Sequence, residues 1–177
     1  MIAPRSQLLT SSSRPLRAAT PAASRDGLLR FPGAEDAWES HAPPDLSTLI
    51  LRFSVSRNEE YVALTARDEH RTIDLGARAH HVVLLALARS RLADREARIA
   101  SQVDHQEPRS DSSDGWIYFD ELSTQLAMDE PHLNVAVFRG RRQLAQAGIL
   151  GAAGIIERRR LTRELRLGVG RLELETV

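Results

Sequence analysis

The sequence contains no cysteine and no lysine, and each absence excludes several kinds of chemistry. All 24 basic side chains are arginines. Without cysteine there can be no disulfide framework, no thiolate nucleophile and no metal site built on sulfur ligands. Without lysine there can be no phosphate-binding loop that depends on its lysine and no Schiff-base enzyme. Catalysis would have to rely on serine, histidine or carboxylate groups.

Long apolar runs and aromatic residues are also scarce. No run approaches the roughly 18 apolar residues that a membrane span needs, and no compact apolar stretch follows the basic N-terminus as in a signal peptide. We therefore expect a cytoplasmic protein that does not bind a membrane. With 177 residues and 5% aromatics, the chain fits one modest domain plus some unstructured length.

Residues 1–45 are predicted to form a disordered leader. This segment is rich in Ser, Pro, Ala and Arg, and its apolar residues follow neither a helical nor a strand period. Four arginines precede its first acid, Asp26, which is also typical of an organellar transit peptide. The use of arginine alone, with abundant alanine, suggests a GC-rich bacterial genome and so favours a plain leader.

Residues 46–76 are predicted to form an antiparallel β-hairpin and a third strand. Apolar and polar residues alternate over 49–55 and again over 62–66, with a polar turn between them. A short third strand over 72–75 ends at Gly76.

The period becomes helical at Ala77, and residues 77–177 are predicted to form a second region. A helix to about Ile99 is followed by a mobile connection over 104–115 and a strand over 116–119. Asp120 is expected to cap a brief helix, and Pro131 to open a last helix that ends at Gly148. Strands over 155–159 and 165–169 complete the order. This order predicts an α+β fold, a winged helix-turn-helix preceded by a small antiparallel sheet.

The last helix and its neighbours resemble a known family. The stretch 133–144 reads Leu-Asn-Val-Ala-Val-Phe-Arg-Gly-Arg-Arg-Gln-Leu, which is similar to the third helix of the OmpR/PhoB-type winged-helix DNA-binding domain of bacterial transcription regulators. The chain also resembles winged-helix segments found with bacterial phosphopeptide-binding FHA domains, through Glu157-Arg158-Arg159. The resemblance implies a DNA-binding output module whose sensor domain or protein partner is supplied in trans.

The helix at 131–147 has a face that suits base recognition. At about 100° per residue, Val135, Arg139, Arg142 and Gln146 share one side. Arginine can bind guanine through two hydrogen bonds, glutamine can pair with adenine, and valine can contact a thymine methyl group. The alternative for this face is a solvated surface.

The charges are unevenly distributed along a chain of zero formal net charge. Nine arginines and only two acids lie between Arg139 and Arg171, whereas 94–130 holds ten carboxylates and three arginines. A basic hairpin at 155–169, the predicted wing, is suited to phosphate contact. Alternatively, this hairpin pairs with the acidic half of its own chain. The predicted contacts with double-stranded DNA are Asn134, Val135, Phe138, Arg139, Arg142, Gln146, Arg158, Arg160 and Arg163.

A protein-docking module is the competing interpretation. Val135 and Phe138 together would form an apolar patch, a composition found at protein interfaces. Gly140 also stands where the winged-helix family packs an apolar residue, and the predicted wing lacks that family's glycine-rich, aromatic ending.

No catalytic or metal-binding constellation is evident. The six histidines show no His-Glu-x-x-His spacing, and no serine lies in a Gly-x-Ser-x-Gly motif. His80 and His81 are expected to point about 100° apart on a helix, one toward the core and one toward solvent. The sequence therefore predicts a protein that is not an enzyme and that needs no metal or cofactor.

Overall fold

The computed structural model describes residues 42–102 and 114–177, which belong to one compact unit. Residues 1–41 of the predicted leader and 103–113 of the predicted mobile connection lie outside the described residues. Residues 42–45 are described, and they are tied to the fold. The Leu150 amide donates to the Pro44 carbonyl at 2.8 Å, and the Leu46 amide donates to the Leu150 carbonyl at 3.0 Å. Ordered structure thus begins before Leu46, because this segment pairs with a distant backbone.

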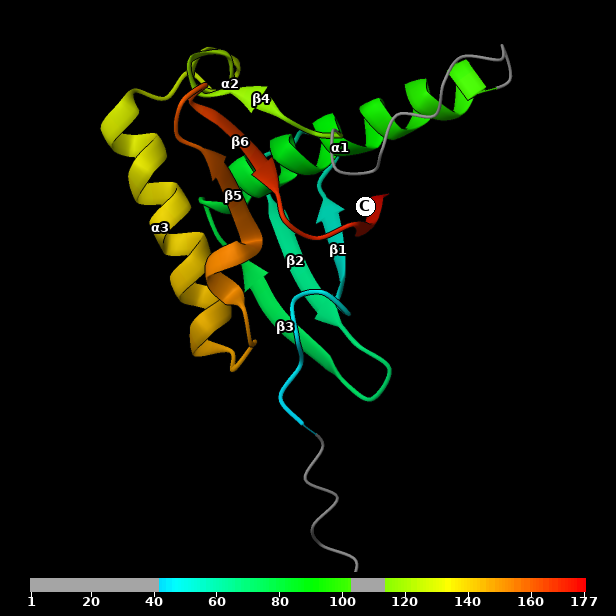
Figure 1. The fold of residues 1–177 in the computed structure, drawn as a ribbon. Helices are drawn as coiled ribbons and strands as arrows, with labels where there is room; N and C mark the ends of the chain where they lie inside the picture. The colour runs from blue at the N-terminus through cyan, green and yellow to red at the C-terminus, as the bar shows by residue number, and fades with distance from the viewer. Residues whose placement is uncertain (1–41, 103–113) are drawn as a thin grey trace, which may run out of the picture. The chain divides into compact units, whose positions relative to one another are not determined.

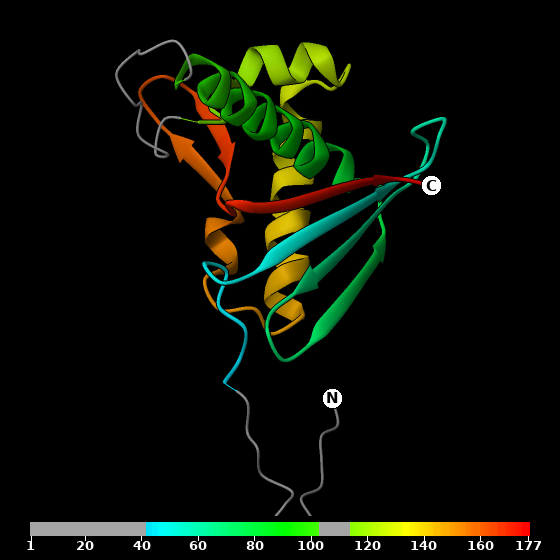
Figure 2. The same ribbon diagram turned by 90° about the vertical axis from the view of Figure 1, so that its right-hand side faces the viewer.

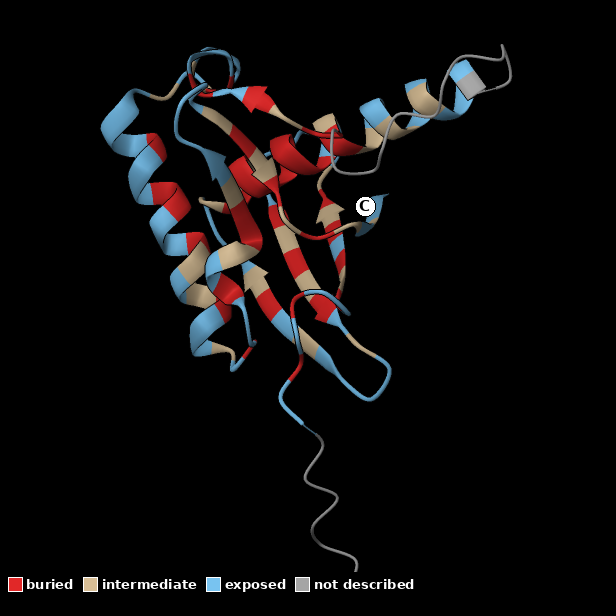
Figure 3. Cartoon of the chain, viewed as in Figure 1, coloured by how far each residue is buried: buried red, intermediate tan, exposed pale blue. Residues whose placement is uncertain are grey.

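Three strands form the first part of the described chain. β1 (Ile50–Val55), β2 (Val62–Arg67) and β3 (Thr72–Ala77) pair antiparallel in sequence order, as the alternation predicts. Leu51, Phe53 and Val55 are buried on one face of β1, and Arg52 is exposed on the other. Figure 3 shows buried residues alternating with more exposed ones along these strands, so one face of the sheet is buried and apolar and the other faces outward.

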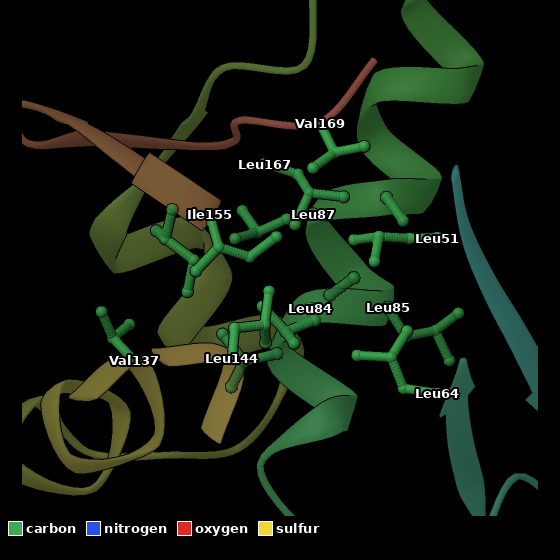
Figure 4. Close-up of a cluster of buried hydrophobic side chains, with 14 of the residues drawn as sticks. Leu51, Leu64, Leu84, Leu85, Leu87, Val137, Leu144, Ile155, Leu167 and Val169 are labelled. Carbon is green, nitrogen blue, oxygen red and sulfur yellow. The ribbon is translucent and has the colours of Figure 1, made fainter. Parts of the chain in front are cut away.

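The helix α1 (His81–Gln102) covers the apolar face of this sheet (Figure 1). It begins later than the predicted Ala77 because that residue continues β3, and the next residues form a turn in which the His81 amide donates to the Arg78 carbonyl at 2.9 Å. The buried side chains of α1 lie between the sheet and the second half of the chain (Figure 4). The labelled core residues there are Leu51, Leu64, Leu84, Leu85, Leu87, Val137, Leu144, Ile155, Leu167 and Val169.

The second half of the described chain contains two helices and a three-stranded sheet. Its elements are β4 (Ile117–Tyr118), α2 (Phe119–Gln125), α3 (Glu130–Gln146), the 3₁₀ helix η2 (Ala152–Ile155), β5 (Ile156–Arg159) and β6 (Glu164–Leu167). The strand order is β4-β6-β5. The prediction that Asp120 caps α2 is wrong, because the helix begins at Phe119 and its N-cap is Tyr118, two residues before Asp120. Asp120 instead lies in the first turn, where a carboxylate interacts favourably with the helix dipole.

The strand β7 (Arg171–Thr176) was not expected from the sequence. It returns to the first sheet and pairs parallel with β1, so that the order there is β3-β2-β1-β7. Figure 2 shows β7 in red beside β1. This sheet therefore takes strands from both sides of the boundary expected after Gly76.

Two arginines of α1 hold the connection between the two sheets. Arg91 is buried and donates to the Leu167 carbonyl, and Arg95 donates to the Gly170 carbonyl at 2.8 Å. With three α-helices and two sheets in its described part, the chain has an α+β fold, and this prediction of fold class is confirmed.

Candidate nucleic-acid interface

The helix α3 is defined by signals at both ends. The Asp129 side chain accepts a hydrogen bond from the His132 amide at 2.9 Å, and Pro131 lies in the first turn, an arrangement typical of a helix N-terminus. At the other end Gly148 adopts a φ of 76°, which favours glycine and stops the helix. One face of α3 packs on the core through Leu133, Ala136, Val137, Gly140 and Leu144.

The opposite face of α3 holds all six residues predicted from the helix, and all six are exposed. Val135 is 45% exposed and Phe138 is 60% exposed, unusual values for apolar side chains within one helix face. The remaining four are Asn134, Arg139, Arg142 and Gln146. We call this set of six residues the α3 face.

The two arginines of the α3 face are available for contacts outside the chain. Neither Arg139 nor Arg142 has a hydrogen bond or ion pair with another described residue. Arg141, between them in sequence, points the other way and donates to the Ile156 carbonyl. That contact fixes α3 to the start of β5, and the sequence did not indicate it.

The β5–β6 hairpin carries the remaining three predicted residues, and they differ in what they contact. Arg160 is exposed and has no hydrogen bond or ion pair within the described residues. The Arg158 guanidinium lies 5.6 Å from the centre of the Phe119 ring, an attractive cation–π arrangement. Next to Arg160 at the hairpin tip, Leu161 is 100% exposed.

Arg163 is engaged within the chain. Its guanidinium lies 3.2 Å from the Glu130 carboxylate at the start of α3 and 3.6 Å from the Asp120 carboxylate of α2. It also lies 5.2 Å from the centre of the Phe119 ring. This one arginine therefore follows the alternative in which the basic hairpin pairs with the acidic half of the chain, whereas Arg160 does not.

A second group of arginines stabilises the hairpin and was not predicted. The guanidinium groups of Arg159 and Arg166 lie 4.0 Å and 4.6 Å from the centre of the Trp116 ring. Arg159 also pairs with Glu164 at 3.2 Å. The pKa of Glu164 is lowered, first by the hydrogen bond from the Thr162 hydroxyl and then by Arg159.

The signal for this arrangement was present in the sequence. Arg159 lies directly opposite Glu164 and Glu157 directly opposite Arg166 in the β5–β6 register, so opposite charges face each other across the two strands.

A polar cluster links the buried side of α3 to α1. The Nε2 atoms of His80 and His81 both lie 2.7 Å from Oε1 of Gln143, whose Nε2 donates to the Leu75 carbonyl at 2.6 Å. His81 is fully buried, as expected for one of the pair. His80, which was expected to face solvent, is half-buried and contacts Gln143. Its pKa is lowered, and burial is the main cause.

Two other kinds of site are not evident in residues 42–102 and 114–177. No three histidine, aspartate or glutamate side chains gather there in a way that could hold a metal ion. Within the same residues, no helix combines the length and apolar character needed to cross a membrane.

Comparison of the chain with protein-family models, with curated proteins and with solved structures finds no match.

Proposed function

We propose that this chain is a winged-helix DNA-binding regulator that recognises a specific sequence in double-stranded DNA. In this proposal the α3 face enters the major groove, and the β5–β6 hairpin is the wing that contacts the flanking phosphates. The single observation that carries the proposal is the exposure of the complete α3 face, together with Arg139, Arg142 and Arg160, which have no hydrogen bond or ion pair within residues 42–102 and 114–177.

The α3 face is suited to the major groove in length and chemistry. Its 17-residue helix is about 25 Å long at 1.5 Å per residue, and a major groove about 12 Å wide admits one helix. Arg139 and Arg142 carry planar groups that can bind a guanine edge through two hydrogen bonds, and Gln146 can do the same with adenine. Exposed arginine that is not neutralised by its own chain also supplies affinity through release of counterions from DNA.

Arg163 has a different role in the proposal. Asp120 and Glu130 place two carboxylates beside the N-terminal end of α3, where they would repel DNA phosphates. Because Arg163 pairs with both, it offsets part of this charge next to the DNA-facing surface. Arg158 and Arg160 remain as the phosphate contacts of the wing.

The proposal is tested by measuring the affinity of the full chain for duplex DNA across a series of salt concentrations. A selection from a random duplex pool first identifies the preferred sequence. Replacing Arg139 or Arg142 by alanine should cost about 1–3 kcal/mol on that sequence and relax the preference. Replacing Arg158 or Arg160 should weaken binding to all sequences alike and reduce the salt slope by about one unit per lost contact.

The matched control is Arg57→Ala. Arg57 is an exposed arginine in the turn between β1 and β2, and like Arg139 and Arg142 it has no hydrogen bond or ion pair with another described residue, so its loss should leave DNA affinity unchanged. The regulator proposal fails if the wild-type chain shows no salt-dependent affinity for DNA at low ionic strength, or if both arginine classes bind like the wild type.

The exposure of Phe138 and Val135 favours one second candidate, a protein-interaction module centred on these two side chains. An aromatic residue bordered by arginines is a common composition of interface hot spots. If this candidate is correct, Phe138→Ala abolishes binding of a protein partner and leaves any DNA affinity nearly unchanged. The opposite pattern, loss of DNA affinity without loss of protein binding, would exclude it.

A further inference from the structure

The strand β7 forms an open edge of the first sheet. It stands last in the order β3-β2-β1-β7, so no strand of the described chain pairs with its outer side. Its six residues, Arg171–Thr176, contain no proline and no bulge, two of the features that protect an edge. A third such feature, charged side chains, is present in Arg171, Glu173 and Glu175, which alternate with the two leucines. The opposite edge is less suitable for pairing, because the register between β2 and β3 shifts and Gly76 has a φ of 64°.

The backbone groups on the outer side of β7 can be assigned. The Val177 amide donates to the Val55 carbonyl at 2.9 Å and so points toward β1. Backbone groups alternate between the two sides of a strand, so those of Glu173 and Glu175 also point toward β1. The N–H and C=O groups of Leu172 and Leu174 therefore point outward, away from the sheet.

The side chains of β7 divide between the two faces of the sheet. Leu172 and Leu174 are in register with buried Leu51 and Phe53, yet Leu174 is 38% exposed because nothing described lies beyond it. Arg171, Glu173 and Glu175 lie on the polar face. Arg171 has no ion pair with another described residue. A shallow hollow at the start of β7 is lined by Arg95, Arg171 and Leu172 together with Ser47 and Ile50 from the β1 side.

The sequence of β7 is complementary to itself when a second copy runs antiparallel. With the two-fold axis at Glu173, Leu172 lies opposite the partner's Leu174, and Arg171 lies opposite the partner's Glu175. Arg52 of its own chain already contacts each Glu175 on one side, so Arg171 would be a second basic partner for that carboxylate. The outward backbone groups of the leucines then form the hydrogen-bonded pairs of the ladder. The two Glu173 side chains meet at the axis, and each is 3.4 Å from Arg67 of its own chain, which offsets their repulsion. A shift of one residue would place each leucine opposite a charged side chain.

We propose that the β7 edge is the interface of a symmetric dimer of this chain, in which two four-stranded sheets join into one. The interface is isologous, since the same strand serves both copies. Edge pairing alone is small relative to the roughly 1,200 Å² of a stable interface. The helix α1 adds surface to this interface. It begins at β2, reaches the start of β7, where Arg95 donates to the Gly170 carbonyl, and then continues to Gln102 (Figure 2). In these last turns Ile99 is 56% exposed.

Substitutions that reverse the charge of Arg171 or Glu175 test this proposal. In sedimentation velocity, the full chain should show a dimer of twice its 19.7 kDa mass at micromolar concentrations. Arg171→Glu should be monomeric because it faces the partner's Glu175. Glu175→Arg should be monomeric because it faces the partner's Arg171; since it also loses its pair with Arg52, its unfolding is measured as well, to show that β7 stays in place. An equimolar mixture of the two variants should form a heterodimer, because both cross-strand pairs are then opposite in charge.

Two controls separate this interface from others. Arg78→Glu makes the same change of charge beyond the opposite edge, after β3, and should leave the dimer intact, as should Phe138→Ala. A monomeric wild-type chain at several hundred micromolar overturns the proposal. A dimer that survives Arg171→Glu, or variants that fail to associate when mixed, overturns the interface or its register.

Hydrogen exchange provides a measurement without any substitution. The outward amides of Leu172 and Leu174 should gain at least tenfold protection as concentration rises through the dimerisation range, whereas the inward amides of Glu173 and Glu175 should be protected throughout. If the protection of the leucine amides and that of the glutamate amides depend on concentration in the same way, the proposal is overturned. Neither experiment depends on DNA binding, so this interface stands or fails independently of the proposed function.

Discussion

Gly140→Ala is expected to stabilise the protein, although it adds a side chain at a buried position. Gly140 lies in the middle of α3 on the side that faces α1. A methyl group there would lie 3.7 Å and 3.8 Å from the two terminal carbons of Leu84 and 3.9 Å from Cδ2 of His80. These are ordinary van der Waals distances, so the space for one methyl group already exists.

The expected gain has two sources. Glycine in a helix interior costs about 0.8–1.0 kcal/mol relative to alanine, because it loses more backbone freedom on folding. Burial of one methyl group against Leu84 adds up to about 0.8 kcal/mol. Together these raise the free energy of unfolding by about 1–2 kcal/mol, which corresponds to an increase in Tm of about 3–8 °C for a domain of this size.

Urea and thermal unfolding followed by circular dichroism measure this change. Gly168→Ala is the matched control, because a methyl group at that position would lie 1.9 Å from the Gly154 carbonyl oxygen and must displace backbone. The two substitutions should therefore change stability in opposite directions. A loss of stability in Gly140→Ala would refute the argument, and since its methyl group points at α1, its DNA affinity should equal that of the wild type.

Three further predictions follow from the contacts described above. The pKa of His80 is lowered in the folded chain, mainly by burial, so the unfolded state binds the proton more strongly. The free energy of unfolding should therefore fall as the pH drops below about 6.5. In urea unfolding, His80→Gln should flatten this part of the pH profile. Trp116→Leu should lower stability by about 1–2 kcal/mol, since it keeps an apolar side chain but removes two cation–π contacts, and hydrogen exchange should accelerate in β5 and β6 first. Arg163→Ala should weaken DNA binding by exposing two carboxylates, and adding Glu130→Gln should restore part of the affinity; an additive loss in the double variant would contradict the neutralising role of Arg163.

The parts of the fold with strong local periodicity were predictable. The alternation through Leu51, Phe53 and Val55 identified β1, and a spacing of 100° per residue separated the buried and exposed faces of α3. β7 was missed although Leu172 and Leu174 also alternate. Its partner is β1, far away in the sequence, and no local pattern specifies which strand a six-residue segment joins.

The candidate site shows the same division. The exposure of Arg139 and Arg142 follows from helix geometry alone, and the structure places both on the exposed face. The ion pairs of Arg163 do not follow from local geometry, because its partners come from α2 and from the start of α3 and contact it only through tertiary packing. The sequence could identify basic residues but not which of them the chain itself neutralises.

The parallel pairing of β1 with β7 has a consequence for the nascent chain. Arg52 and Glu175, which pair across these strands, are 123 residues apart. At about 5–20 residues per second, synthesis of the intervening chain takes about 6–25 seconds. During that interval the β1 edge, with Leu51 and Phe53 behind it, has no strand to cover it. This is the period in which the chain is most exposed to misassembly on a polysome, where neighbouring nascent chains present the same uncovered edge.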